Sequence, residues 1–109
     1  MKPIELKPFV GEASALLKVM GNEHRLMVLC YLSDGERSVG QLEVMIGLSQ
    51  SALSQHLAKL RRDKLVATRR DRQTIYYSLA SNHAVSVMRT LCEAFARPLQ
   101  ASIGNPMPA

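Results

Sequence analysis

Hydrogen-bonding side chains gather on one face of a predicted helix over residues 49–62. If Leu53, Leu57 and Leu60 face a core, the opposite face is polar. A glutamine amide can form two hydrogen bonds to an adenine edge, and a serine hydroxyl can donate or accept. A merely solvated helix face would usually carry glutamates, and this face has none. The pattern therefore favours contact with DNA through Gln50, Ser51, Ser54, Gln55 and Lys59.

His56 lies at the border between the two faces of this helix. A packed or locally hydrogen-bonded imidazole is the interpretation that the sequence favours. A contact with a phosphate or a base is the alternative, and it stays open.

The positive charge of the chain is concentrated around this helix. Lys and Arg outnumber Asp and Glu by five between residues 49 and 77, so this stretch accounts for the whole net charge of +5. A basic stretch on a neutral body is typical of a protein that binds a polyanion, usually a nucleic acid. Near the helix C-terminus, Lys59, Arg61 and Arg62 can reach phosphates.

A β-hairpin with a basic tip is predicted directly after the helix. Residues 65–69 and 74–79 are rich in β-forming side chains and flank the tip, residues 70–73. Such a wing can follow the DNA backbone or place arginine in a narrow minor groove. The alternative is a charged sheet edge that discourages aggregation. One arginine is expected to pair with Asp71. The predicted DNA contacts are Arg69, Arg70, Arg72 and Gln73.

Short helices are predicted before this unit, after a loose start punctuated by Pro3 and Pro8. The first covers residues 12–20, the second follows an Asn22 cap and ends near residue 33, and residues 34–37 form a turn. Ser38 and Gln41 match a capping box that opens the third helix. Residues 47–49 then lead tightly into the helix over residues 49–62. Two helices joined by a glycine-containing turn are typical of a helix-turn-helix.

A long apolar stripe restores helical periodicity after residue 82, with Pro98 near its end. Its members are Val85, Met88, Leu91, Cys92, Phe95 and Leu99. The element order is therefore α-α-α-α-β-β-α. The predicted fold class is mainly α with a β-hairpin wing, which is a winged helix-turn-helix.

Length and composition exclude several classes of protein. The 109 residues are expected to form one domain, residues 1–109, in which residues 102–109 are a loose tail. No apolar run approaches the ~20 residues of a membrane span, and no signal pattern is found, so we expect a cytoplasmic protein with no membrane partner. No catalytic set, phosphate loop or metal motif is recognised, so we expect no enzyme activity and no cofactor.

The stretch LSQSALSQHLAKLRRDKLVATRRDRQTIYYSL, residues 48–79, closely resembles the ArsR/SmtB family of bacterial transcriptional regulators. The stretch LLKVMGNEHRLMVLCYLSDGERSVGQLE, residues 16–43, is similar to the family's first three helices. The resemblance covers residues 13–95 and is greatest to the branch with a hemolysin activator, a nodulation regulator and sulfide-responsive biofilm repressors. It implies a homodimeric repressor or anti-silencer.

Dimerisation through the first and last helices is also implied by the resemblance. The residues agree, because the last stripe and the N-terminal apolar residues offer more apolar surface than a small monomer needs. The N-terminal set is Ile4, Leu6, Phe9, Val10, Leu16 and Leu17. The alternative is that both stripes only close the monomer core. In a two-fold dimer the two DNA-reading helices would reach half-sites of double-stranded DNA about one turn (~34 Å) apart.

The sensor sites of the family match this chain only in part. Metal-sensing members carry a Cys-x-Cys in the third helix, where this chain has no Cys, and their Asp-x-His set in the last helix is also missing. We therefore expect no metal, with a mixed site of His24, Cys30, His83 and Cys92 as the weaker alternative.

Cys30 matches the position of one of the two sensing thiols in the sulfide- and redox-responsive branch. The second thiol of that branch falls on Ala96 here, whereas Cys92 lies four residues earlier. Two alternatives stay open: a redox switch formed by Cys30 and Cys92, or two small buried apolar residues, which is the commonest role of cysteine.

A winged helix that binds RNA or a protein partner is the rival function from another class. The uncharged polar face argues against a protein partner, which would prefer aromatic or aliphatic anchors. The deep, narrow major groove of RNA does not admit a helix. The sequence therefore favours duplex DNA.

Overall fold

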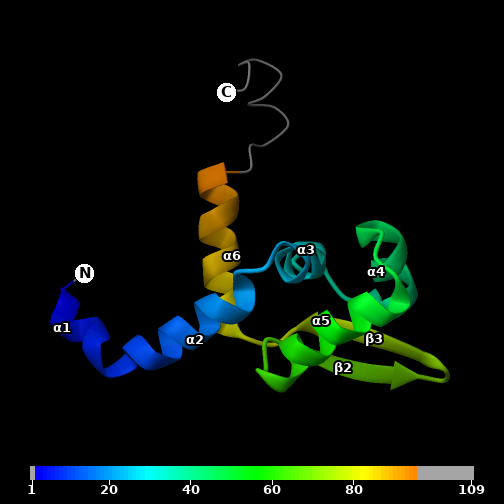
Figure 1. Cartoon of the computed structure of the whole chain (residues 1–109), viewed down its shortest axis with the longest axis horizontal. Coiled ribbons are helices and arrows are strands. Elements are labelled where there is room, and N and C mark those ends of the chain that lie inside the picture. The colour runs from blue at the N-terminus through cyan, green and yellow to red at the C-terminus, as the bar shows by residue number, and fades with distance from the viewer. Residues whose placement is uncertain (1, 96–109) are drawn as a thin grey trace, which may run out of the picture.

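The computed structural model describes residues 2–95, which form a mainly helical protein with one small sheet (Figure 1). In chain order, the elements are α1 (Pro3–Leu6), the 3₁₀ turn η1 (Lys7–Phe9), α2 (Val10–Met20), α3 (Glu23–Leu32), β1 (Arg37–Ser38), α4 (Val39–Ile46), α5 (Gln50–Arg62), β2 (Val66–Asp71), β3 (Thr74–Leu79) and α6 (Asn82–Phe95). The predicted fold class, a winged helix-turn-helix, is confirmed.

The helix caps predicted from the sequence are present. The Asn22 side chain accepts hydrogen bonds from the backbone N–H groups of His24 and Arg25, both at 3.0 Å. Ser38 and Gln41 form the reciprocal capping box at the start of α4. Gly47 ends α4 with a φ of 81°, in the left-handed region that glycine adopts without strain. These caps fix the start of α3 and both ends of α4, the first helix of the helix-turn-helix.

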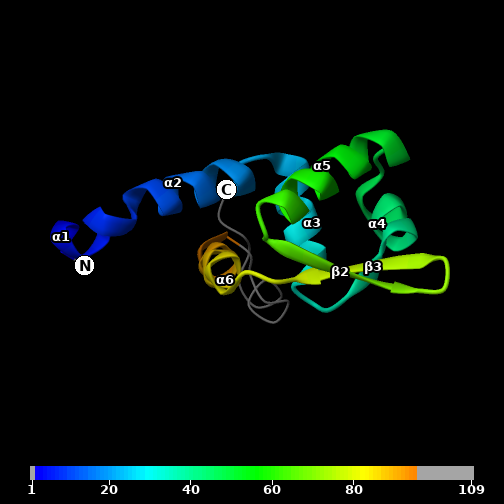
Figure 2. The same ribbon diagram turned by 90° about the horizontal axis from the view of Figure 1, so that it is seen from below.

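The core lies where α3, α4 and α5 meet the sheet and the first half of α6 (Figures 1 and 2). α3 contacts both α4 and α5, and α5 contacts β2. Leucine and valine dominate, as the shortage of aromatic residues requires. The buried residues are Val19, Met20, Val28, Leu29, Leu32, Leu42, Leu53, Leu57, Leu60, Leu65, Val66, Ala84 and Met88.

The sheet has three antiparallel strands in the order β1-β3-β2, one more than the sequence predicted. The predicted turn over residues 34–37 includes Arg37, which belongs instead to β1 and pairs with Tyr77 of β3. The expected four-residue hairpin tip is also wrong, because β2 continues to Asp71 and pairs there with Thr74. The turn itself is Arg72 and Gln73, with Arg72 at a φ of 60°.

The N-terminal segment forms an arm rather than a loose start. α1, η1 and α2 follow one another and run away from the body, at the end of the molecule opposite the wing (Figures 1 and 2). Pro8 is accommodated because it sits in the first turn of η1, where a missing N–H costs no hydrogen bond. The helix expected from residue 12 begins at Val10.

Several sequence predictions lie outside the described residues, namely Leu99, Pro98, Ala96 and the tail over residues 102–109. Within residues 2–95, no helix combines the length and the apolar character needed to span a bilayer.

Candidate nucleic-acid interface

Helix α5 turns its polar face to solvent because the leucines of its other face are buried in the core. Leu53, Leu57 and Leu60 are each at most 1% exposed. The start of the helix is fixed by Ser49, whose hydroxyl oxygen accepts a hydrogen bond from the N–H of Ala52 at 3.2 Å. Four residues predicted to contact bases are exposed on the other face: Gln50, Ser51, Ser54 and Gln55.

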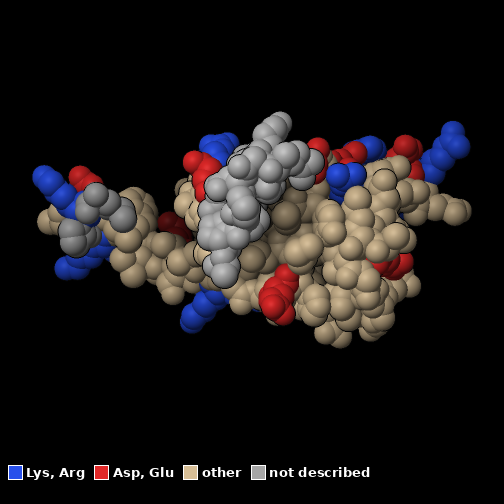
Figure 3. Space-filling model, turned by 90° about the horizontal axis from the view of Figure 1, so that it is seen from above, with Lys and Arg blue, Asp and Glu red and all other residues tan. Residues whose placement is uncertain are grey.

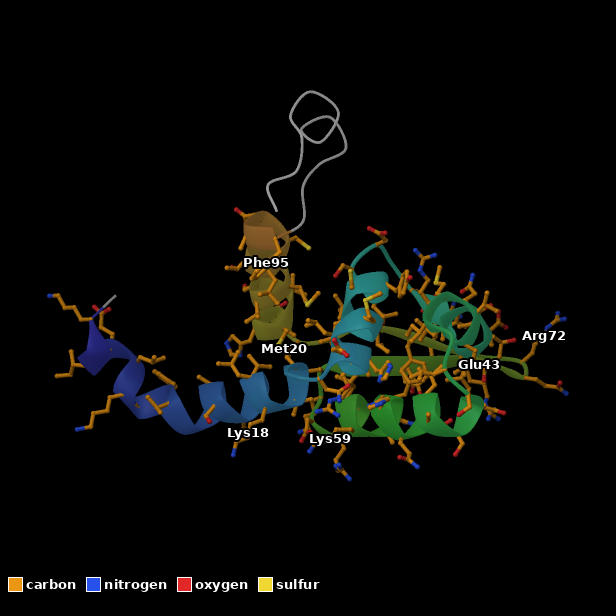
Figure 4. The ribbon with its side chains drawn as sticks, turned by 45° about the horizontal axis from the view of Figure 1, so that its top comes forward. Lys18, Met20, Glu43, Lys59, Arg72 and Phe95 are labelled. Atoms are coloured by element: carbon orange, nitrogen blue, oxygen red, sulfur yellow. The ribbon has the colours of Figure 1, made fainter. Side chains whose placement is uncertain are left out.

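The basic end of α5 is partly paired. The Lys59 ammonium lies 3.0 Å from the Asp63 carboxylate, with 40% and 33% of the two side chains exposed. Figure 4 shows Lys59 at the end of α5 that lies toward α2. Arg61 and Arg62 are exposed in the same turn. Three basic residues therefore stand at the helix C-terminus, where positive charge is also favoured by the helix dipole.

His56 packs against α3, in agreement with the interpretation that the sequence favoured. Its ring is partly buried and lies 5.4 Å from the ring of His24, at an angle of 41°. Burial lowers the pKa of His56, and the nearby positive charges of Arg25 and His24 lower it further. Arg25 is itself held in place, because its Nε donates to the carbonyl of Val19 at 2.6 Å.

Arg69 of the wing is paired with Glu36. The expected ion pair between Asp71 and one of the wing arginines is not found among the described residues 2–95. Its Nε and a terminal nitrogen donate to the two oxygens of the Glu36 carboxylate, both at 2.7 Å. Its guanidinium carbon lies 4.4 Å from the centre of the Tyr76 ring. The hydrogen bonds from Arg69 hold the pKa of Glu36 below its usual value. The same bonds raise the pKa of Arg69, to which Asp71 contributes only a weaker attraction.

The remaining basic residues lie toward the tip of the wing. Arg70, Arg72 and Gln73 are all exposed. Arg72 projects from the tip, at the end of the molecule farthest from the arm (Figure 4), and basic side chains also project at that end in Figure 3. Because side chains alternate along a strand, Arg70 is on the sheet face of the buried Val66, and Arg69 is on the opposite face.

Glu36 is the residue of this site that the sequence did not indicate. It is 33 positions from Arg69 in the chain, and it reaches Arg69 only because β1 joins the sheet. A prediction of β1 would have placed Glu36 near the wing, but two residues carry too weak a pattern for that.

Cys30 on α3 and Cys92 on α6 are exposed free thiols, so the alternative of two buried apolar residues is wrong. Cys92 borders a groove between the turn after α3, strand β3 and α6, and Cys30 does not. His83 is exposed at the start of α6. Within residues 2–95, no three His, Cys, Asp or Glu side chains are close enough together to hold a metal ion.

Large apolar side chains stay exposed on the arm and at the end of α6. Leu16 is half-buried, whereas Leu17 is 57% exposed and Phe95 is 77% exposed. The other exposed members of the arm are Ile4, Leu6, Phe9 and Val10. These residues leave part of the predicted dimer surface uncovered in the single chain.

A capped helix pair, an exposed polar second helix and a basic hairpin beside it together define a winged helix-turn-helix of the DNA-binding class. The family model described as "Bacterial regulatory protein, arsR family" matches residues 22–68. The transcriptional activator HlyU of Vibrio cholerae is 47% identical over 96 residues, which are 88% of this chain and 89% of that protein.

Two further relatives are also similar over most of this chain. The nodulation protein NolR of Rhizobium meliloti is 44% identical over 95 residues, which are 87% of this chain and 78% of NolR. The crystal structure of the transcriptional repressor BigR from Xylella fastidiosa has a TM-score of 0.84 and 37% identity, and the match covers 90% of this chain and 100% of the chain in that structure. The chain belongs to the arsR family and is a DNA-binding transcriptional regulator rather than an enzyme.

Proposed function

We propose that this regulator binds duplex DNA as a homodimer, at an operator with two-fold symmetry, and acts as a repressor or an anti-silencer. Gln50, Ser51, Ser54 and Gln55 of α5 contact base edges in the major groove. Lys59 of the same helix contacts the DNA beside these residues, and His56 is the further candidate contact of this helix. The wing follows the backbone or enters the minor groove through Arg69, Arg70, Arg72 and Gln73.

The observation that carries this proposal is the exposed face of α5, which has no acidic residue from Gln50 to Arg62. An acidic side chain on a helix in the major groove would face phosphates on both sides. Glutamine and serine instead offer donors and acceptors without charge, which suits base edges. The wing, with Arg70 and Arg72 exposed beside α5, adds the charge that phosphate contacts need.

The dimer is supported by the shape of the chain and by its uncovered apolar surface. The radius of gyration is 15.9 Å, whereas a compact chain of about 100 residues has about 13 Å. The arm accounts for much of the extension, and it carries Ile4 at 75% and Phe9 at 57% exposure. A second copy would bury this surface and set two α5 helices about one DNA turn apart.

The test is selection of a duplex from a randomised DNA library with the full-length protein. Binding of the selected duplex, a scrambled duplex and an RNA of the same sequence is then compared by fluorescence anisotropy. We expect tight binding of the selected duplex alone, with two protein chains per duplex by light scattering. Failure to select any duplex, or equal binding of the RNA, would contradict the proposal.

A thiol switch is a second proposal, supported by the exposure of both Cys30 and Cys92 to solvent. An oxidant that removes two electrons and two protons would join the sulfurs in a disulfide. A polysulfide that supplies two zero-valent sulfur atoms would instead leave one of them between the two cysteine sulfurs, while the other takes the two electrons and two protons and leaves as hydrogen sulfide. Either link would tether α3 to α6 and shift the spacing of the two α5 helices. Equal DNA affinity of the reduced protein, the persulfide-treated protein and Cys30→Ser would exclude the switch.

A further inference from the structure

We propose that Glu36 is a positioning residue for the wing, and that Arg69 holds the wing in place instead of contacting DNA. The inference rests on the proposed function, because only a protein that places its wing on DNA needs the wing held at a fixed position. It refines the wing contacts to Arg70, Arg72 and Gln73.

The contacts of Arg69 leave its guanidinium little freedom. Both oxygens of Glu36 accept from it at 2.7 Å, and the Tyr76 ring lies 4.4 Å away. Tyr76 is the direct cross-strand partner of Arg69. A two-point hydrogen bond and a stacking contact each fix the orientation of the planar guanidinium, and a lysine could not supply the two-point hydrogen bond. A phosphate would have to displace a carboxylate that already accepts two hydrogen bonds from Arg69.

The position of the pair in the sheet explains what it holds. Glu36 stands immediately before β1, which pairs with Tyr76 and Tyr77 and continues into α4. The Glu36–Arg69 pair therefore links the two outer strands across β3. Beyond Arg69 and Tyr76 the hairpin has only two strands, and an isolated two-stranded hairpin is marginally stable. The pair is thus a side-chain link to the wing at the last residues where the sheet still has three strands.

Arg70 and Arg72, which lie between the Glu36–Arg69 pair and the end of the hairpin, are the residues that this pair holds in position. Arg70 follows Arg69 directly, Arg72 lies two residues after Arg70, and both are exposed. Arg70 is on the sheet face that packs on the helices, whereas Arg69 is on the opposite face. Holding the tip before DNA binds removes part of the entropy cost of ordering these side chains in the complex.

Glu36→Gln tests the inference because the two explanations predict opposite changes in DNA affinity. Loss of one negative charge near DNA should by itself tighten binding. If Glu36 holds the wing, Glu36→Gln should instead weaken binding of the selected duplex by about threefold or more, while the scrambled duplex binds equally well or better. The full-length variant is measured by anisotropy, with circular dichroism to confirm folding.

Asp34→Asn is the matched control, because Asp34 lies in the same turn, its side chain is 83% exposed, and its nearest cation, Arg37, is 4.0 Å away. It removes the same charge and should bind both duplexes as tightly as the unmodified protein, or more tightly. Arg69→Lys is the second variant, because it keeps every charge and removes the two-point hydrogen bond between the guanidinium and Glu36. We expect Arg69→Lys to weaken selected-duplex binding as Glu36→Gln does, and the double variant to be no weaker than either.

Two results would overturn the inference. One is tighter binding of both duplexes by Glu36→Gln, as expected if Glu36 only competes with DNA for Arg69. The other is normal binding by Arg69→Lys, as expected if Arg69 is a simple phosphate contact. Failure of the unmodified protein to select any duplex would be a different result, because it would remove the proposed function and this inference with it.

Discussion

Gln55 lies on the exposed face of α5, opposite the buried Leu53 and Leu57, and is the clearest candidate for a base contact. We expect Gln55→Ala to weaken binding of the selected duplex by about 1–3 kcal/mol and to relax the base preference at one position of each half-site. Binding to the scrambled duplex should be unchanged. Anisotropy with singly substituted duplexes measures both effects, and unchanged specificity would show that α5 presents a different face to DNA.

His56 gives a pH dependence of stability whose sign follows from its burial. Its pKa is lowered in the folded chain from the ordinary value of 6.5, first by burial and then by Arg25 and His24. Below pH 6.5 the unfolded chain therefore binds more protons than the folded one. The contribution of His56 to the free energy of unfolding should be complete above that pH, and it should be lost as the pH drops through the lowered pKa.

Replacement of the imidazole tests this sign. His56→Gln should flatten the loss of stability below pH 6.5, measured by urea denaturation over a series of pH values. An unchanged slope in His56→Gln would contradict the assignment.

The wing is the element whose charge should set the salt dependence of binding. Arg72→Asn removes a tip charge while keeping a residue that tolerates the φ of 60° found there. Affinity should fall for selected and scrambled duplexes alike, and the salt slope should become shallower by about 0.9 for each phosphate that is no longer neutralised. Arg89→Asn, an exposed arginine of α6 away from the wing, should change neither. Equal slopes in the two variants would exclude a phosphate contact by Arg72.

Elements with a local signal were predictable from the sequence, and elements defined by distant partners were not. The Asn22 cap, the Ser38–Gln41 capping box and the leucine periodicity of α5 depend on residues within one or two turns. β1 has two residues and exists because β3 pairs with it. The length of β2 likewise depends on the pairing of Asp71 with Thr74, and propensity alone placed Asp71 in the turn.

The same division holds for the candidate site. Exposure of the polar residues of α5 follows from the period of one helix, so their side of the helix was predictable. The partner of Arg69 was not, because Asp71 is near in sequence whereas Glu36 is brought near by the fold. The exposure of both cysteines also departed from the usual burial of that residue. Helical periodicity did not indicate it, because Cys92 is exposed although it lies one turn after the buried Met88.

At the scale of the whole molecule, the arm and α6 should decide the oligomeric state. Phe9→Glu places a charge within the exposed apolar set of the arm, so we expect a monomer by light scattering and a large loss of affinity for the two-half-site duplex. Val44→Glu is the control, because Val44 is 85% exposed on α4, outside the arm, and should leave the dimer intact. A Phe9→Glu variant that remains dimeric would remove the arm from the interface.

The most direct measurement is a hydroxyl-radical footprint of the full-length protein on its selected duplex. If α5 and the wing bind DNA from two paired chains, the footprint should contain two protected half-sites related by two-fold symmetry and about one helical turn apart. Wing contacts should extend the protection on the outer side of each half-site, and Glu36→Gln should shorten that extension. A single protected segment, or no protection at low salt, would contradict the proposed mode of binding.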